Sequence, residues 1–463
     1  MPAPAPAPEA ETRSKNVGDS VTHSQDSKAK TASKRISNQS NEQNKYEGER
    51  YVTRIHGKYY DLTSFKHPGG PIAIASIQGR DGTELFESHH IFTDKNVKQI
   101  LEKYEMPSPP AEEISINNVY DWEATLKDPF TVELKDIARK QLGKDIKINW
   151  YRTVEITILF LIAVSQMYKF GQGEWYSLFT LPLAWWVFGV NLFHDGSHFS
   201  ISENWKINEL SMDLGFMFAT PYVWMHQHVI GHHSFPNIMG KDPDLYHAPR
   251  FVRHSNDIRV RYAHTIQYIT FIGTWIVGVP AGLLLYGIYQ SLNFASYNKV
   301  VKFANNKYLN TDTLRLRRYA YFLIIHILPF ILHGLTWKGL IFSLIPIYLV
   351  SVFFMISSQI NHLTPDSTDK FDKNFFKHQI ITASNVAPDS YLVFVFTGGL
   401  NLQTEHHLFP SVNHIHLRKM QPYIRDLCKK YNVQYNETHS LWNALKLHVQ
   451  HLFNKSGIDQ KQL

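Results

Sequence analysis

The sequence of 463 residues predicts a multidomain protein, in which a small α+β domain precedes an all-α integral membrane domain of about four transmembrane helices. Three observations lead to this prediction. An alternating segment followed by helical patterns lies near the N-terminus, long apolar runs follow it, and three groups of paired histidines adjoin those runs. We divide the chain into a polar tail at 1–46, a small domain at 47–106, a linker at 107–125 and a membrane domain at 126–463.

The tail and the overall composition narrow the class of protein. The tail is rich in Ser, Lys, Asn, Gln and Pro, so it cannot bury enough apolar surface to offset the entropy of ordering, and we expect it to be disordered. The single cysteine, Cys428, excludes an internal disulfide and fits soluble parts that face the cytosol. The net charge of +7 forms no basic stripe with interleaved aromatics, so we expect no nucleic-acid partner.

The small domain opens with an alternating segment at 52–60 that is broken by a His-Gly-Lys turn, which predicts a β-hairpin. His67-Pro-Gly-Gly then forces a tight turn directly after a histidine. Helical patterns follow and end at the pair His89-His90. The Pro-containing segment at 107–110 is typical of an extended linker.

The membrane domain is predicted from its apolar runs. Those at 153–170 and 175–193 have the length that a helix needs to cross about 30 Å of hydrocarbon, and the short break between them predicts a helical hairpin. Further apolar runs lie at 265–289, 319–332 and 340–360. If all the histidines form one site, an even number of crossings separates the second group from the third, so one of these three runs does not cross. Either the run at 265–289 or the run at 319–332 could be the one that does not cross the membrane.

Three histidine boxes follow or lie between these runs: His194-Asp-Gly-Ser-His198, His228-Val-Ile-Gly-His232-His233 and Gln403-Thr-Glu-His406-His407. Residues four positions apart share one face of an α-helix, so the two histidines of box one, and the first two of box two, are expected to aim at one point. Neutral imidazole suits iron, copper, zinc and nickel, and converging pairs would hold more than one ion. Asp195 and Glu405 are expected to orient imidazoles by accepting their N–H protons, and Asp242 and Asp244 would do the same or form a turn.

The small domain resembles the cytochrome b5 domain, in which a histidine in a His-Pro-Gly-Gly turn and another about two dozen residues later hold haem b. The resemblance assigns these roles to His67 and His90, with Phe86 at a matching position. His89 adjoins the second ligand, and the spacing favours His90. A haem with two histidine ligands carries electrons and does not bind oxygen.

An electron-carrying domain fused to a membrane domain with these boxes resembles the front-end fatty acyl desaturases, and the glutamine that opens box three is the mark of the cytochrome b5-fused branch. The resemblance implies a centre of two iron ions at the cytosolic face, with one further histidine after the last span, where Asn361-His362 stands. It implies the metal ligands His194, His198, His228, His232, His233, His362, His406 and His407. Gln403 and Asn361 would be a further ligand or a supporting group.

The resemblance implies an oxidoreductase that introduces a cis double bond into a polyunsaturated C20 acyl chain, with O2 and electrons from the fused haem domain. Box two has three residues between its first histidine and its histidine pair, and with the Phe-Pro-Asn and Asp-Pro-Asp that follow it is most similar to Δ5 enzymes. A Δ6 fatty acid desaturase and a sphingoid long-chain-base Δ8 desaturase are the alternatives. A non-catalytic membrane carrier of haem or metal is a distant one, because transport sites usually lie at mid-membrane.

The resemblance also implies partners and a location. The substrate would be a fatty acyl group on CoA or on a phospholipid, the co-substrate dioxygen, and the electron donor cytochrome b5 reductase. Membrane lipids would surround a multi-pass protein of the endoplasmic reticulum, with its haem domain and histidine boxes facing the cytosol.

Overall fold

The structure is a computed structural model that describes residues 50–92, 95–143, 146–214, 221–246, 248–278, 280 and 323–458. The tail predicted at 1–46 lies outside these residues.

The small domain contains the predicted hairpin. Strands β1 (Val52–Ile55) and β2 (Lys58–Asp61) pair antiparallel, and Ile55 pairs with Lys58, so that only His56 and Gly57 form the turn. Both turn residues have positive φ, 49° and 80°, which is the geometry of the two-residue turns that match the twist of the strands. Helices α2 (Pro71–Ala75), α3 (Thr83–His89) and α4 (Lys95–Glu102) follow. The domain encloses its own apolar core of Ile55, Tyr60, Leu62, Ile74 and Ile77.

The predicted linker is packed for part of its length. Tyr120 is buried, and its hydroxyl donates to the carbonyl of Ser234 at 3.0 Å. Helix α5 (Trp122–Lys127) follows, and α6 (Pro129–Leu142) begins with a proline at its first position, where the missing N–H costs nothing. The aromatic side chains of this segment therefore hold it against the membrane domain.

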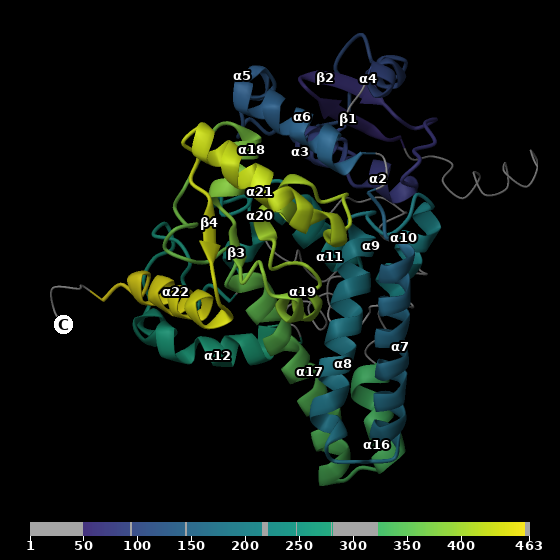
Figure 1. Ribbon diagram of the computed structural model, residues 1–463, viewed down its shortest axis with the longest axis vertical. Helices are drawn as coiled ribbons and strands as arrows, with labels where there is room; N and C mark the ends of the chain where they lie inside the picture. The colour runs from purple at the N-terminus through teal and green to yellow at the C-terminus, as the bar shows by residue number, and fades with distance from the viewer. Residues whose placement is uncertain are drawn as a thin grey trace, which may run out of the picture. The chain divides into compact units, whose positions relative to one another are not determined.

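Two long helices form the predicted hairpin: α7 (Trp150–Gly171) and α8 (Ser177–Gly189). Helix α8 continues through the π-helix η2 (Val190–His194) and the short α9 (Asp195–Ser197). With α17 (Trp337–Gln359), they make three segments of 22, 21 and 23 residues that are long and apolar enough to cross a membrane. Figure 1 shows these helices running side by side, with the α7–α8 turn at the far end from the small domain.

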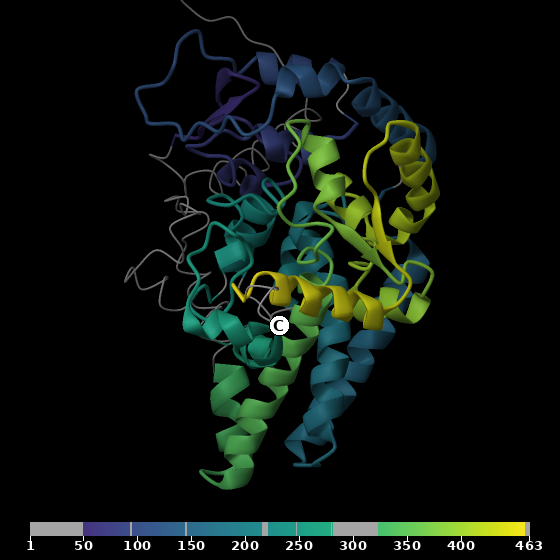
Figure 2. The ribbon, with the colours of Figure 1, turned by 90° about the vertical axis from the view of Figure 1, so that its left-hand side faces the viewer.

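The remaining apolar runs differ in direction. Helix α12 (Gln267–Gly278), which makes up most of the described part of the run at 265–289, lies across the long helices in Figures 1 and 2. The π-helix η7 (Leu323–Ile327) and α16 (Leu328–His333) lie along α17 and lead into it through a short turn. Among the described residues between boxes two and three, η7–α16 and then α17 run along the long axis, and α17 alone is long and apolar enough to cross a membrane by itself.

The other elements gather at the box-bearing end of the long helices. They are α10 (Trp205–Leu214), α11 (Pro221–Trp224), η3 (Met225–His232), η4 (Pro243–Tyr246), η5 (Tyr262–Ile266), α18 (Phe375–Ile381), β3 (Ser384–Val386), α19 (Tyr391–Thr397), α20 (Gln403–Leu408), α21 (His414–Lys430), β4 (Asn436–Thr438) and α22 (Leu441–Asn454). Strands β3 and β4 pair in parallel. A core that includes Phe130, Phe376 and Phe409 supports α20, the helix that carries box three.

Helix α3 holds a buried carboxyl group that makes stability depend on pH. Glu84 is buried and accepts a hydrogen bond from the Trp122 indole N–H at 3.3 Å. Burial, and secondly the nearby Asp81, raise the pKa of Glu84 from its ordinary 4.5 to about 8. A carboxyl group whose pKa is higher in the folded state makes folding less favourable as the pH rises from the unfolded value through the folded value.

We therefore expect Glu84→Gln to stabilise the protein more at about pH 9 than at about pH 5, because the amide stays neutral while the carboxyl must ionise in a buried site. The thermal midpoint of the full chain, followed by tryptophan fluorescence, measures the difference from wild type. Glu123→Gln, at an exposed side chain of α5, is the control and should show no such trend. An increase in thermal midpoint that is the same at both pH values would show that the pKa of Glu84 is not raised in the folded protein.

Candidate metal centre and haem pocket

The three histidine boxes converge where η2, α9, η3 and α20 meet. All eight predicted metal ligands are buried there. Their imidazole nitrogens form two groups, and within each group the nitrogens lie within 4.8 Å of one another. The five-histidine group comprises His194, His198, His228, His233 and His406, and the three-histidine group comprises His232, His362 and His407. The structure thus brings together every histidine that the sequence singled out for this site.

The distances within the groups fit metal ions. Nε2 of His228 lies 3.0 Å from Nε2 of His194 and 3.2 Å from that of His233, and the Nε2 atoms of His232 and His362 are 3.2 Å apart. Nitrogens bound side by side to one ion at roughly 2 Å lie roughly 3 Å from each other. Among the described residues, both ring nitrogens of His198 are buried without a hydrogen-bond partner. Such orphaned nitrogens are costly unless a ligand occupies them.

Box two does not fold as the α-helical spacing predicts. Box one does, since its two histidines fall in the same group, but the first two histidines of box two fall in different groups. Box two lies in the π-helix η3, where the N–H of His233 bonds to the carbonyl of His228 at 3.0 Å. Because a π-helix bonds residues five apart, His228 shares a face with His233, and His232 turns to the three-histidine group.

Groups behind the rings fix the orientation of the three-histidine group. Nδ1 of His232 lies 3.1 Å from Oδ2 of Asp242, Nδ1 of His362 lies 3.0 Å from the carbonyl of Thr382, and Nδ1 of His407 lies 2.8 Å from Oε1 of Gln379. Partners of this kind select the tautomer that presents Nε2 to a metal. Asp242 also accepts the N–H of Asp244 at 2.9 Å, so it serves both as a support and in a turn. Gln379 lies on α18 outside every box, and no sequence signal marks it.

The carboxylates inside the boxes have other partners. Asp195 accepts hydrogen bonds from His414 Nδ1 and, at 2.9 Å, from Asn413 Nδ2, while Nδ1 of His194 is 3.9 Å away. Glu405 accepts from Asn385 Nδ2 and the Tyr435 hydroxyl, both at 2.8 Å. The expectation that Glu405 orients an imidazole is therefore wrong, because its side chain faces the β3 side of α20.

Gln403 and Asn361 lie beside the three-histidine group. The side-chain nitrogen of Gln403 is 2.8 Å from Nε2 of His362, so its amide reaches the ligand nitrogens. Asn361 Nδ2 donates to the carbonyls of Ser357 and Leu400 and lies 3.4 Å from Oε1 of Gln403. Asn361 thus stands behind Gln403.

Burial keeps most of these imidazoles neutral, which is the ligating form. It lowers the pKa well below the ordinary value at His198, His228, His233, His406 and His407, and to about 3 at His362. His232 differs: burial would lower its pKa, but Asp242 and Asp244 outweigh burial and raise the pKa to about 9. Asp242 and Asp244 thus place negative charge beside the three-histidine group.

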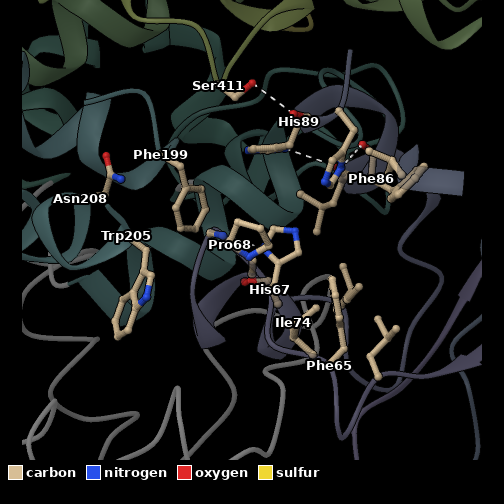
Figure 3. Close-up of a pocket in the computed structure, with 18 of the residues that line it drawn as sticks. Phe65, His67, Pro68, Ile74, Phe86, His89, Phe199, Trp205, Asn208 and Ser411 are labelled. Atoms are coloured by element: carbon tan, nitrogen blue, oxygen red, sulfur yellow. Dashed lines mark hydrogen bonds between the residues drawn. The ribbon is translucent and has the colours of Figure 1, made fainter. Parts of the chain in front are cut away.

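A second site lies between the small domain and the membrane domain (Figure 3). A cavity of about 390 Å³ contains His67 and His90, whose ring centroids are 5.7 Å apart with planes at 89°. The N–H of Gly69 donates to His67 Nδ1, and His90 Nδ1 lies 2.9 Å from the carbonyl of Phe86, so both rings are held from behind. The lining is largely apolar, which suits a flat hydrophobic cofactor held by two imidazoles.

These observations define a class of protein: a membrane protein with a buried, all-nitrogen metal centre beside a domain built to hold haem. Residues 173–439 match the family model for fatty acid desaturases, and residues 37–106 match that for the cytochrome b5-like heme/steroid binding domain. The chain belongs to the fatty acid desaturase family, and it is an oxidoreductase with a fused cytochrome b5-like domain. The family resemblance seen in the sequence is confirmed.

Individual relatives share about a quarter of their residues with the chain. Acyl-lipid (8-3)-desaturase B of Dictyostelium discoideum is 28% identical over 437 residues, covering 88% of this chain and 91% of the relative. Probable Delta(5) fatty acid desaturase C of the same organism is 27% identical over 432 residues, covering 86% and 90%. The sn-1 linoleoyl-lipid 6-desaturase of Synechocystis is 28% identical over 267 residues, covering 55% and 73%.

We expect His67→Ala and His90→Ala each to abolish a low-spin b-type haem spectrum, because each removes one of two axial ligands. Absorption spectra of the reduced, purified protein measure this. The control is His56→Asn in the β1–β2 turn, where asparagine tolerates the positive φ and the spectrum should survive. A low-spin spectrum retained in both alanine variants would show that His67 and His90 are not the two haem ligands.

We expect His233→Gln to abolish desaturation and to reduce non-haem iron, because His233 lies within reach of four other ring nitrogens of the five-histidine group. Iron is measured by mass spectrometry against the haem absorbance, which should not change. His448→Gln is the matched control: His448 is equally buried but belongs to no nitrogen group found among the described residues. Full iron occupancy with normal turnover in His233→Gln would contradict a shared centre.

Proposed function

We propose that this protein is a front-end fatty acid desaturase of the Δ5 type, which introduces a cis double bond into a polyunsaturated C20 acyl chain. The observation that carries the proposal is the convergence of eight boxed and post-span histidines into two nitrogen groups, in the same compact unit as the His67–His90 pair. Membership of the family alone does not show that this chain has the side chains for both a metal centre and a haem that donates electrons to it.

The ligands are His67 and His90 for haem b, and the eight grouped histidines for two iron ions, with Gln403 as a further ligand or support. Removing hydrogen from an unactivated methylene needs an oxidant stronger than any side chain, and two iron ions held by these histidines would supply it with O2. The chain's own residues hold and orient the ligands. Asp242, Gln379 and the Thr382 carbonyl contact the outer ring nitrogens of the three-histidine group and fix the orientation of its rings. Ligation by nitrogen distinguishes this centre from the carboxylate-rich di-iron bundles.

Box two supports the Δ5 assignment. Box two has three residues between its first histidine and its histidine pair, one more than boxes that have two. The π-helix η3 accommodates this extra residue and keeps His228 and His233 together. The names of the relatives include both a Delta(5) and a 6-desaturase at nearly equal identity, so identity does not select the position. The box-two spacing and its Phe-Pro-Asn and Asp-Pro-Asp neighbours are what favour Δ5 over Δ6 or a sphingoid Δ8 reaction.

The same arrangement supports a proposal for the location and the partners. The boxes and the small domain lie at one end of the long helices, and the α7–α8 turn lies at the other. We assign the box-bearing end to the cytosolic face of the endoplasmic reticulum membrane, where cytochrome b5 reductase would reduce the haem. The fused domain raises the effective concentration of the electron donor at the centre. The acyl group would arrive on CoA or on a phospholipid.

We expect yeast that expresses this chain and is fed dihomo-γ-linolenic acid to make arachidonic acid, through a new double bond at carbon five. Mass spectrometry of the cellular fatty acids locates the bond, and the His233→Gln variant serves as the inactive control. A front-end enzyme must hold the carboxyl end and measure inward from it, so the position of the bond should not change when longer chains are fed.

Three other outcomes would each reject the Δ5 assignment. A new bond at carbon six of eighteen-carbon acids, with none at carbon five, would identify a Δ6 enzyme. A product confined to sphingolipid bases would identify a long-chain-base desaturase. No product at all from protein that retains haem and iron would favour a carrier.

A further inference from the structure

Two neighbouring histidines at the end of α3 both line the haem cavity, but their rings have different partners. The ring of His90 faces His67 across the cavity, as described above. The ring of His89 instead stacks on His198, with centroids 6.1 Å apart and planes 24° apart. His198 belongs to the five-histidine group. His89 therefore both lines the haem cavity and contacts the metal centre, and a single peptide bond joins it to His90.

The His89 side chain is held in this place. Its Nδ1 lies 3.1 Å from the carbonyl of Leu85 and 3.0 Å from the hydroxyl of Ser88, and Phe199 meets its ring edge-on at 6.3 Å. The backbone carbonyl of His89 accepts a hydrogen bond from Ser411, the contact drawn in Figure 3. Nε2 of His89 is buried and has no hydrogen-bond partner within the described part of the chain.

Two further contacts bring the small domain and the membrane domain close together near this stacking. Lys135 of α6 lies 2.6 Å from Glu87 of α3, and both side chains are largely buried, so the pair is shielded from water. At Gly70 in the His-Pro-Gly-Gly turn, a Cβ atom would lie 2.6 Å from a ring carbon of Trp205, so only glycine permits this approach. The haem cavity is thus walled on one side by the membrane domain.

We propose that His89 is the side chain through which electrons pass from the haem to the metal centre, an inference that rests on the proposed function. The route runs from the His90 ring through one peptide bond to His89, and then across the stacked rings to His198. Each transfer oxidises ferrous haem to ferric haem and reduces the centre by one electron. No bond forms or breaks and no proton moves, and two transfers supply one turnover, with the reductase restoring ferrous haem.

Two substitutions at His89 separate the ring from its hydrogen bonds. His89→Phe keeps a flat ring for stacking but cannot bond to the Leu85 carbonyl, whereas His89→Gln keeps a donor for that carbonyl but has no ring. If the ring conducts, His89→Phe should retain most of the electron-transfer rate and His89→Gln should lose it by about tenfold or more. If His89 is only structural, the order should reverse. Trp122→Phe, which alters the same interface away from this route, is the control and should leave the rate unchanged.

The rate is measured by photoreducing the haem of the full-length protein in lipid nanodiscs without O2, and following its reoxidation by the oxidised metal centre. Haem spectrum, haem reduction potential and iron content should match wild type in both variants. After chemical reduction of the centre, His89→Gln should give a wild-type yield of product in a single turnover. That result would locate the defect in electron delivery, because the centre itself would be intact.

Several results would overturn the proposal. An unchanged reoxidation rate in His89→Gln, or a slower rate in His89→Phe than in His89→Gln, would show that the ring is not the route. Loss of the haem spectrum in His89→Gln would show that His89 holds the small domain together or ligates haem. If wild type shows haem reoxidation by the centre but makes no unsaturated product, the proposed function fails while the route can still be judged.

Discussion

The burial of eight imidazole rings at one end of a set of membrane helices is the constraint on which the rest of the structure depends. Each buried ring has two polar nitrogens, and a buried polar atom without a partner costs about 1–3 kcal/mol. The structure meets this cost in two ways. Carbonyl, amide and carboxylate groups bond to the outer nitrogens of the three-histidine group, and the inner nitrogens approach one another at about the spacing of ligands on a shared ion. The centre is therefore a stable arrangement mainly as a metal-loaded one.

The π-helices are a direct response to that constraint. An α-helix through box two would direct its first two histidines to one point and its last histidine elsewhere. In η3 the bonding pattern moves by one residue, so His228 and His233 serve one group while His232 serves the other. One helical segment thus supplies ligands to both groups. The π-helix η2, which ends at His194, adjusts the end of α8 in the same region.

The sequence was sufficient wherever short-range pattern determines structure. The length of the apolar runs predicted the α7–α8 hairpin, and the spacing of box one predicted that His194 and His198 act together. It was insufficient where long-range packing decides. The bonding pattern of η3 depends on where the other boxes lie, and Gln379 reaches His407 only through the placement of α18. The direction of α12 depends on its contacts with α17 and α22, because its apolar composition alone suits either crossing a membrane or lying across it.

The shared wall of the haem cavity has a consequence for how the protein is made. One side of the cavity comes from the small domain, and the other includes Phe199, Trp205 and Val229, which the ribosome adds much later. Domains fold in the order of synthesis, so the small domain presents His67 and His90 on an open face before that wall exists. Haem can enter by this face early in synthesis, whereas after docking Trp205 covers the turn at Gly70. The order of translation therefore lets haem bind His67 and His90 before the membrane-domain part of the wall is added.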